Sequence, residues 1–366
     1  MNDLLRYQIG LTLIKGIGPV NARKLISYLG SVEAIFCEKK DILKKVPGIG
    51  EVLAAEISTQ QVLKRADKEI EFIQKHHIKT HYFADASYPY RLKECDDAPI
   101  LLYSTGNCDF NSGHFVAIVG TRKITPYGKD ICHELVQTLA ETQQHITIVS
   151  GLAYGTDICA HKSALENQIP TIGVVAHGLD RIYPSAHTSI AKKMVANGAV
   201  ITEYLSETNP DAPNFVERNR IVAGLCDAVI IIESPKRGGS LITAQIANDY
   251  NRDVFAFPGK VSDIYSEGCN QLIRTNRAAL ITCGKDLIDF MGWDVAQNKP
   301  QQQILFNELN PDEQKIIETI NKAGTIYINI LAKETDISLQ KLLALLVQLE
   351  FKGLIKALPG SMYKCA

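Results

Sequence analysis

The segment Asn214-Phe-Val-Glu-Arg-Asn-Arg-Ile-Val-Ala-Gly224 is followed by Ala228-Val-Ile-Ile-Ile232, by Gly238-Gly-Ser-Leu-Ile-Thr-Ala244 and by Asp253-Val-Phe-Ala-Phe257. The second and fourth pieces are nearly continuous in apolar residues, which is typical of strands buried on both faces of a parallel sheet. The other two carry glycines, hydroxyls and guanidiniums. Since open α/β sheets bind ligands beyond the carboxyl ends of their strands, this stretch predicts an α/β domain with an anion-binding edge.

Similar apolar runs alternate with helical patterns along the middle of the chain, as in a mostly parallel, doubly wound sheet. The other expected strands are 115–119, 146–149, 171–175, 199–202 and 279–282, and helices are expected at 128–143 and 243–251. A connecting region with an amphipathic helix and a short strand at 97–103 precedes them. The fold class is therefore a Rossmann-like α/β domain.

The amino-terminal part contains an internal repeat. Leu13-Ile-Lys-Gly-Ile-Gly18 recurs as Lys45-Val-Pro-Gly-Ile-Gly50, each with an alanine four positions later and an apolar helical pattern. Two helices joined by a Gly-hydrophobic-Gly turn form a helix-hairpin-helix unit, whose turn amides can face a DNA phosphate. A packed helical module without DNA contact is the alternative that the sequence leaves open.

Near the carboxyl end, Asn310-Pro-Asp-Glu313 begins a helix with a cap and a proline in the favoured order. A leucine-rich helix at 338–350 and a two-stranded hairpin at 353–363 predict a winged-helix domain. Lys341 is the one cation of that helix, which favours protein contact or packing over reading of the major groove. The expected domains are a helix-hairpin-helix domain at 1–65, a Rossmann-like domain at 66–292, a linker at 293–303 and a winged-helix domain at 304–366.

Composition excludes several classes of protein. The 366 residues include 39 Lys and Arg against 40 Asp and Glu, so any polyanion site must be local. Nine cysteines without a Cys-x-x-Cys pair favour reduced structural thiols over zinc or disulfides, and His76, His77 and His81 lack a fourth ligand nearby. The start of the chain lacks a leader pattern and no run is long enough to span a membrane, so we expect a cytoplasmic location.

Small residues and cations cluster after the expected strands. Helix starts favour anions, and arginine can bind phosphate through two hydrogen bonds. We expect arginine and lysine to neutralise phosphates, Ser150, Asn219 and Ser240 to donate hydrogen bonds, and the amides of Gly151 and Gly239 to complete the site. The candidate residues are Gly120, Thr121, Arg122, Ser150, Gly151, Ala153, Arg218, Asn219, Arg220, Gly238, Gly239, Ser240 and Lys260.

The same motifs offer little for chemistry. They match neither Gly-x-Gly-x-x-Gly nor a P-loop, so no cofactor is expected. They contain no paired carboxylates, metal cluster or nucleophile-base pair. Asp157 and Glu217 are the nearest carboxylates, and each has a structural alternative, capping of a helix start for Asp157 and pairing with an arginine for Glu217. The sequence therefore indicates a binding protein that is not an enzyme.

A set of motifs in this order resembles the DNA-processing protein A (DprA/Smf) family. They are Gly120-Thr-Arg122, Ser150-Gly-Leu-Ala153, Gly178-Leu-Asp-Arg-Ile-Tyr-Pro184, Glu203-Tyr204, the segment 214–224, Gly239-Ser-Leu-Ile-Thr-Ala244, Phe257-Pro-Gly259 and Gly268-Cys-Asn-Gln-Leu-Ile273. The resemblance runs from about residue 88 to about residue 290. The sequence departs from the family pattern at Tyr154, at Ala176-His177 and at 185–187.

The resemblance implies a homodimeric protein that binds single-stranded DNA without sequence preference and loads the RecA recombinase during natural transformation, with single-strand-binding protein as a further partner. Arg122 matches the family's DNA-contacting arginine, and Arg218 with Asn219 matches its basic-Asn pair. One alternative is a related Rossmann enzyme that cleaves nucleoside monophosphates, but the turn 236–245 lacks its catalytic glutamate. The other is an adaptor that acts through the winged helix.

Overall fold

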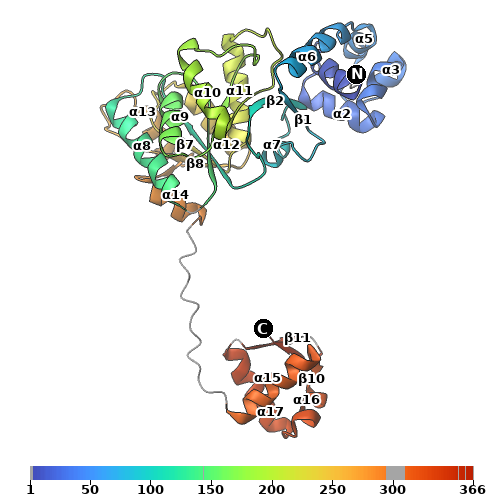
Figure 1. The fold of residues 1–366 in the computed structure, drawn as a ribbon, viewed down its shortest axis with the longest axis vertical. Coiled ribbons are helices and arrows are strands. Elements are labelled where there is room, and N and C mark those ends of the chain that lie inside the picture. Colours follow the sequence, from blue (N-terminus) through green and yellow to red (C-terminus); the bar gives the residue numbers. More distant parts are fainter. Residues whose placement is uncertain (1–2, 143, 294–309, 353, 359, 366) are drawn as a thin grey trace. The chain divides into compact units, whose positions relative to one another are not determined.

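The computed structural model describes residues 3–142, 144–293, 310–352, 354–358 and 360–365. The chain divides into two compact units, Met1–Val295 and Ala296–Ala366 (Figure 1). Each unit has its own hydrophobic core. The expected linker, residues 293–303, lies outside the described residues except for Trp293.

A nine-stranded sheet organises the first unit, in the order β1-β2-β6-β5-β4-β3-β7-β8-β9. All neighbours from β6 to β9 are parallel, whereas β1 and β2 pair antiparallel at one edge. The mostly parallel, Rossmann-like sheet predicted from the apolar runs is confirmed. The strands are β1 (Lys79–Tyr82), β2 (Leu101–Gly106), β3 (His114–Val119), β4 (Ile146–Ser150), β5 (Thr171–Val174), β6 (Ala199–Thr202), β7 (Ala228–Ile231), β8 (Asp253–Ala256) and β9 (Ala279–Leu280).

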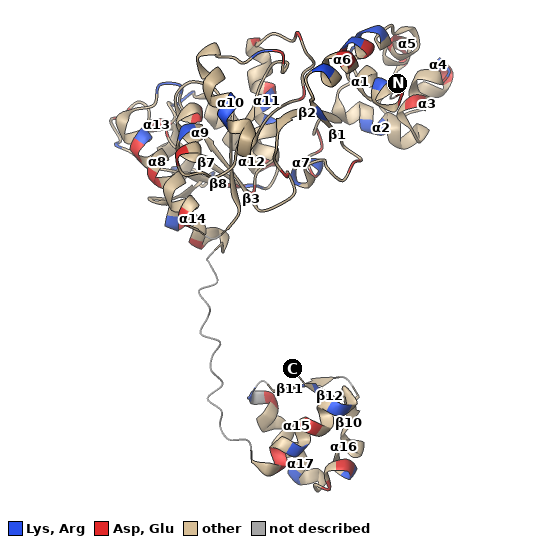
Figure 2. Ribbon diagram, viewed as in Figure 1, with Lys and Arg blue, Asp and Glu red and all other residues tan. Residues whose placement is uncertain are grey.

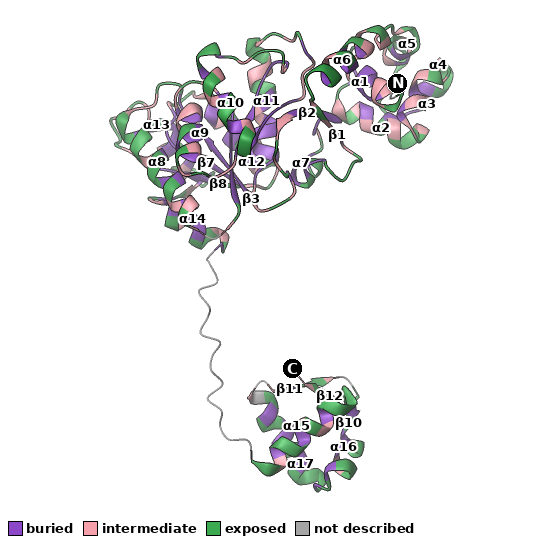
Figure 3. Cartoon of the chain, viewed as in Figure 1, coloured by how far each residue is buried: buried purple, intermediate pink, exposed green. Residues whose placement is uncertain are grey.

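Helices cover both faces of this sheet because its strands are apolar on both sides. Successive residues of a strand point to opposite faces, so Phe115 and Ala117 pack in one core and Val116 and Ile118 in the other. Figure 3 shows buried strands between helices whose outer surfaces are exposed. One face carries α7 (Tyr90–Lys93), α11 (Ala212–Gly224), α12 (Gly239–Asp249) and α13 (Glu267–Arg274), and the other carries α8 (Pro126–Glu141), α9 (Thr156–Glu166), α10 (Thr188–Asn197) and α14 (Gly284–Met291).

The chain order of the strands reverses at β3. From β3 the chain continues to β4 on one side, and it later returns to β7 on the other side. The helices that follow these strands therefore leave in opposite directions, and their amino ends diverge around a crevice at the carboxyl ends of the strands. The expected anion-binding residues follow these strands.

The amino-terminal hairpins pack as a repeated helical module. The helices are α1 (Asp3–Leu13), α2 (Pro19–Leu29), α3 (Val32–Cys37), α4 (Lys40–Leu43), α5 (Glu51–Thr59) and α6 (Leu63–Lys75). Gly16 and Gly48 have φ angles of 79° and 91°, which glycine adopts without strain and which turn the chain between paired helices. The boundary expected between residues 65 and 66 falls within α6, and Ala66, Ile70 and Ile73 continue the module's hydrophobic cluster up to β1 and β2.

The second unit is the predicted winged helix. Asn310 and Glu313 form a capping box at the start of α15 (Pro311–Ala323), as the Asn-Pro-Asp-Glu motif predicts. The other elements are β10 (Thr325–Tyr327), α16 (Ile328–Thr335), α17 (Leu339–Phe351), β11 (Ile355–Leu358) and β12 (Met362–Cys365), with the sheet order β10-β12-β11. No helix of the described chain has the length and apolar character needed to cross a bilayer.

One buried ion pair fixes the amino ends of the central strands. Arg91 Nε donates to Asp227 Oδ1 at 2.6 Å, and the Phe115 amide donates to Asp227 Oδ2 at 2.8 Å. The Arg91 side chain is 4% exposed, so it has almost no access to water. Removing one partner of such a pair leaves an uncompensated buried charge.

Asp227→Ala is expected to lower the free energy of unfolding by about 3 kcal/mol, because it strands Arg91 and the Phe115 amide. Urea denaturation followed by circular dichroism measures this loss. Asp130→Ala is the matched control, since Asp130 is exposed on α8 and should change stability by less than about 0.5 kcal/mol. If Asp227→Ala lowers the free energy of unfolding no more than Asp130→Ala does, Asp227 does not stabilise the fold.

Candidate nucleic-acid interface

A cavity of about 340 Å³ lies at the carboxyl ends of β3, β4 and β7. The structure brings most of the predicted site residues to it, together with others that the sequence reasoning did not select. The predicted residues that line it are Gly120, Thr121, Arg122, Gly151, Ala153, Arg218, Asn219, Gly238, Gly239 and Ser240, and the additional ones include Asp157, Phe215, Val216, Pro235 and Thr243. We call this cavity the switch-point pocket.

The loop after β3 is held by a buried carboxylate that the sequence reasoning missed. Glu233 is 1% exposed and accepts hydrogen bonds from the Thr125 amide at 2.9 Å and the Thr125 hydroxyl at 2.5 Å. The Thr121 amide donates to the Glu233 carbonyl at 2.8 Å. Glu233 thereby fixes the path from Gly120 to the start of α8. The signal that could have identified Glu233 in the sequence is its position two residues after β7, at the edge of the sheet where the site was expected.

The loop after β4 is shaped by Asp157, in the first turn of α9. The Asp157 carboxylate accepts the amides of Gly151 at 3.1 Å and Ala153 at 3.3 Å. Gly155 has a φ angle of 79°, and a Cβ there would lie 2.3 Å from the Thr121 carbonyl oxygen, so only glycine lets the two loops touch. The Gly151 amide is therefore engaged within the protein, which does not favour the prediction that it completes a phosphate cradle.

Arg218 lines the pocket but is itself part of the fold. Its side chain is buried, and its Nη1 donates to the carbonyls of Gly151, at 2.7 Å, and Val174. Burial lowers the pKa of Arg218 while Asp157 raises it, and burial raises the pKa of Asp157 while Arg218 lowers it. The two opposite charges thus offset one another below the pocket floor. Arg218 Nε has no hydrogen-bond partner among the described residues, and the role expected of Arg218 as a phosphate ligand stays a prediction.

Arg122 is the exposed cation of the pocket. Its guanidinium carbon lies 5.5 Å from the centre of the Phe215 ring, and no ion-pair partner is found for it within the described residues. Phe215 and Asn219 are half-buried on α11 and also line the cavity. A phosphate near Arg122 would place its nucleotide beside an aromatic face, which sequence reasoning did not identify.

The start of α12 supplies free amides on the opposite wall. Gly238 is the cap residue without a side-chain acceptor, and no acidic residue occupies the first turn. The amides of Gly239 and Ser240 have no acceptor in the described chain, as is usual at the first positions of a helix. The Ser240 hydroxyl already donates to Ser234 Oγ at 2.9 Å. This wall therefore offers backbone donors and the positive end of a helix dipole.

Three predicted residues lie outside the pocket. The Ser150 hydroxyl is fully buried and donates to the Ile118 carbonyl at 2.6 Å, which ties β4 to β3 and leaves no donor for a ligand. Arg220 is two residues after Arg218, and therefore about 200° around the helix, where it pairs with Glu203. Lys260 follows β8, which lies beyond β7, and does not reach the cavity. Their positions in the sequence suggested that these three side chains join the site, but burial, helical phase and strand order place them away from the pocket.

Tyr154 and His187, at two of the departures from the family pattern, contact one another. Tyr154 is 51% exposed. Its ring contacts the His187 ring edge-on, with the two ring centres 4.9 Å apart. His187 is buried and its Nδ1 lies 2.8 Å from the Leu152 carbonyl oxygen. This contact supports the β4 loop from outside the pocket.

The pocket has little means for bond cleavage. Asp157 is the one carboxylate among its described lining residues, and it is occupied by two backbone amides. Glu217 lines a different cavity of about 240 Å³ and accepts the Tyr204 hydroxyl at 3.1 Å. The described residues also gather no group of three or more His, Cys, Asp or Glu side chains suited to a metal.

The turn glycines Gly18 and Gly50 are exposed, and carboxylates lie in their neighbourhood. Glu51 directly follows Gly50 and pairs with Lys40 at 2.5 Å and Lys44 at 2.6 Å, which lowers the pKa of Glu51 to about 2. Gly18, in the first turn, lines the 240 Å³ cavity with Glu203 and Glu217. DNA contact by these turns and packing without such contact both stay predictions for the hairpins.

In the second unit, helix α17 carries little positive charge for reading DNA. Along α17, Leu339, Leu343 and Val347 are about half exposed and form one apolar stripe. Lys341 pairs with Asp312 at 2.5 Å. Figure 2 shows Lys and Arg interspersed with Asp and Glu on the helices of both units. The arrangement agrees with the prediction that this helix is a poor reader of the major groove.

Three family models match the chain in order. They are described as SAM-like helix-hairpin-helix tandem (residues 9–59), DNA recombination-mediator protein A (residues 79–292) and DprA winged helix domain (residues 300–361). The resemblance identified from the motifs is thereby confirmed.

Named relatives and solved structures agree with the family models. Protein Smf of Synechocystis is 30% identical over 99% of each chain, and DNA processing protein DprA of Streptococcus pneumoniae is 41% identical over 56% of this chain and 71% of its own. The structure of the pneumococcal protein matches with a TM-score of 0.68 at 35% identity, over 78% of this chain and 97% of that one. DNA processing protein A of Helicobacter pylori, solved in a study of its single-stranded DNA binding mode, matches with a TM-score of 0.54 at 31% identity, over 59% and 96%.

The burial of Glu203 predicts a pH-dependent stability. Burial raises the pKa of Glu203 to about 7, against the opposing effect of Arg220. The folded protein then holds a proton that the unfolded chain, with its ordinary pKa of 4.5, releases. The resulting stability is present below about pH 4.5 and is lost as the pH rises through about 7.

We therefore expect the free energy of unfolding of the wild type, minus that of Glu203→Gln, to fall by up to roughly 3 kcal/mol from acidic to mildly alkaline pH. Urea denaturation of both proteins at a series of pH values measures this difference. Subtracting the variant removes the contributions of other titrating groups. A difference that stays flat or rises with pH would contradict the raised pKa.

Proposed function

This chain belongs to the DNA recombination-mediator protein A family, and on that premise we propose that it binds single-stranded DNA without sequence preference and loads a RecA recombinase onto it during natural transformation. The observation that carries the proposal is the exposed Arg122 guanidinium beside the Phe215 ring, opposite the free amides at the start of α12. Together they supply a cation, an aromatic face and backbone donors within one pocket.

Each of these groups recognises a feature that all nucleotides share. Arginine and helix-start amides bind phosphate, and an aromatic ring stacks on any base. Tyr183 is 48% exposed, and its ring centre lies 5.9 Å from that of Phe215, which widens the aromatic surface. Stacking requires an unpaired base, so the pocket suits a single strand better than a duplex. Sequence independence follows because none of these contacts distinguishes the bases.

We propose that the protein acts without catalysing a reaction on its ligand. Asp157 is held by the Gly151 and Ala153 amides, and Glu217 faces the neighbouring cavity and not the switch-point pocket. The pocket thus lacks a base placed to activate water, which weighs against cleavage of nucleoside monophosphates. Incubation of purified protein with nucleoside monophosphates tests this: turnover that Glu217→Gln abolishes would favour the enzyme.

Binding should depend on Arg122 and on salt. Arg122→Ala is expected to weaken binding of labelled oligothymidylate about tenfold, because it removes a charge-assisted contact from a side chain that does not support the fold. The slope of log K against log salt should become shallower by about 0.7. Fluorescence anisotropy titrations over a range of salt concentrations measure both quantities.

Lys162→Ala is the matched control, since Lys162 is an exposed and unpaired lysine on α9 among the described residues and lines no part of the pocket. It should keep wild-type affinity and slope. Wild-type affinity in a folded Arg122→Ala protein would contradict the site assignment. Equal affinity of the wild type for duplex of the same length would contradict single-strand binding.

The same variants test recombinase loading. Wild type and Lys162→Ala should accelerate RecA filament assembly on DNA coated by single-strand-binding protein, whereas Arg122→Ala should not. Assembly is followed by the ATPase activity of RecA. If the wild type binds DNA but gives no acceleration, the mediator proposal fails and the binding proposal stands.

We also propose a homodimer, supported by an unpaired sheet edge. Strand β9 ends the sheet, and Leu280 on it is 50% exposed. Exposed apolar edge strands readily pair with another chain. Sedimentation of Leu280→Asp should show the monomer where the wild type shows the dimer, and a wild-type mass for the variant would place the contact elsewhere.

A further inference from the structure

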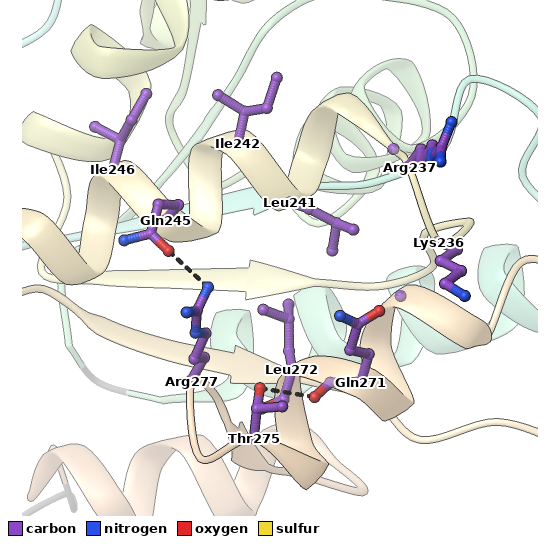
Figure 4. Close-up of a pocket in the computed structure, with 12 residues that line it drawn as sticks. Lys236, Arg237, Leu241, Ile242, Gln245, Ile246, Gln271, Leu272, Thr275 and Arg277 are labelled. Atoms are coloured by element: carbon purple, nitrogen blue, oxygen red, sulfur yellow. Dashed lines mark hydrogen bonds between the residues drawn. The ribbon is translucent and has the colours of Figure 1, made fainter.

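A second large cavity differs in its chemistry from the switch-point pocket. It measures about 750 Å³ and runs between α12 and α13 (Figure 4). We call it the α12–α13 groove. It shares one lining residue, Gly238, with the switch-point pocket, and its other residues carry different chemistry.

Aliphatic side chains form the floor of the groove. Leu241 from α12 and Leu272 from α13 point toward one another, and Ile242 and Ile246 extend the apolar surface along α12. Ile242 is 41% exposed. A continuous aliphatic surface of this kind, rimmed by polar groups, is typical of a protein-binding site.

Positively charged side chains lie at both ends of the aliphatic floor of the groove. Lys236 and Arg237 lie at one end and Arg277 at the other. All three are exposed, and none has an ion-pair partner within the part of the chain that the structure describes. Arg277 donates to Gln245 Oε1 at 2.9 Å, a neutral acceptor that orients the guanidinium and leaves its charge uncompensated.

We propose that the α12–α13 groove binds an acidic amphipathic helix of a partner protein. Aliphatic anchors of such a helix, spaced three and four residues apart, would bury against Leu241, Ile242, Ile246 and Leu272. Its carboxylates would meet Lys236 and Arg237 at one end and Arg277 at the other. The lining glutamines, Gln245 and Gln271, offer amides to the polar flanks of the helix.

Single-stranded DNA fits this groove less well than a peptide does. Binding of single strands relies on aromatic faces for base stacking, and no aromatic residue lines the groove. The switch-point pocket, by contrast, contains Phe215. Cations without stacking surfaces, above an aliphatic floor, match the charge and apolarity of an acidic helix. The inference therefore concerns a protein ligand and does not depend on DNA binding in the other pocket.

The test uses the full chain and a fluorescein-labelled peptide of roughly 14 residues, built from glutamate and alanine with leucines at i, i+3, i+4 and i+7. Fluorescence anisotropy should show salt-sensitive binding. Ile242→Ser and Arg277→Glu should each weaken it at least about fivefold. Two altered peptides, one with the leucines replaced by serine and one with the glutamates replaced by lysine, should bind the wild-type protein no more tightly than the original peptide binds the two variants.

Val52→Ser and Lys192→Glu are the matched controls, because both residues are exposed and lie outside the groove. They should leave peptide binding within about twofold of wild type, as should Arg122→Ala. Retained oligothymidylate binding shows that Ile242→Ser and Arg277→Glu are folded. Absence of peptide binding to the wild type up to about 100 μM overturns the proposal.

A different pattern of losses would identify the other class of ligand. If Arg277→Glu and Ile242→Ser keep the circular dichroism spectrum of the wild type but weaken oligothymidylate binding as much as peptide binding, the groove carries nucleic acid and the peptide proposal is wrong. If Arg122→Ala abolishes peptide binding, the peptide occupies the switch-point pocket, and the proposal is equally overturned.

Discussion

The attraction between the buried charges of Arg218 and Asp157 is the interaction on which the nucleic-acid site depends. Asp157 holds the amides of Gly151 and Ala153, and Arg218 holds the carbonyls of Gly151 and Val174. Two strand ends, one loop and two helices are thereby joined at a single point. Removing either charge would leave the other buried without compensation, which costs more than the pair itself contributes.

This buried pair explains why the cations of the site divide into two kinds. Arg218 and Arg220 each have partners within the protein, two backbone carbonyls for Arg218 and the Glu203 carboxylate for Arg220. Arg122 stays exposed over the Phe215 ring and can exchange water for a ligand. The exposed Arg122 can contribute to ligand binding at little cost to stability. The buried Arg218 and Arg220 instead determine the shape of the site.

Carboxylates shape the rest of the first unit in the same manner. Glu233 fixes the loop after β3, and Glu51 pairs with two lysines beside the second hairpin turn. A nearly neutral chain can therefore present local positive charge, because these acids are used internally while Arg122, Arg237 and Arg277 stay without ion-pair partners in the described residues. The switch-point pocket and the α12–α13 groove differ in what accompanies those cations, an aromatic ring in one and aliphatic side chains in the other.

The sequence by itself determined the parallel strands, the repeated hairpins and the winged helix, because apolar periodicity and turn glycines are local signals. It missed the edge strand β1, in which Lys79, Thr80 and His81 are polar. It placed the start of α12 four residues late, at 243 instead of Gly239, since glycines at a helix start resemble loop. The sequence could not tell which of Arg122, Arg218 and Arg220 is exposed to a ligand, because the three side chains are chemically identical. It also could not identify Phe215 as part of the pocket. Only the tertiary structure decided these roles, because burial and helical phase depend on which elements pack together.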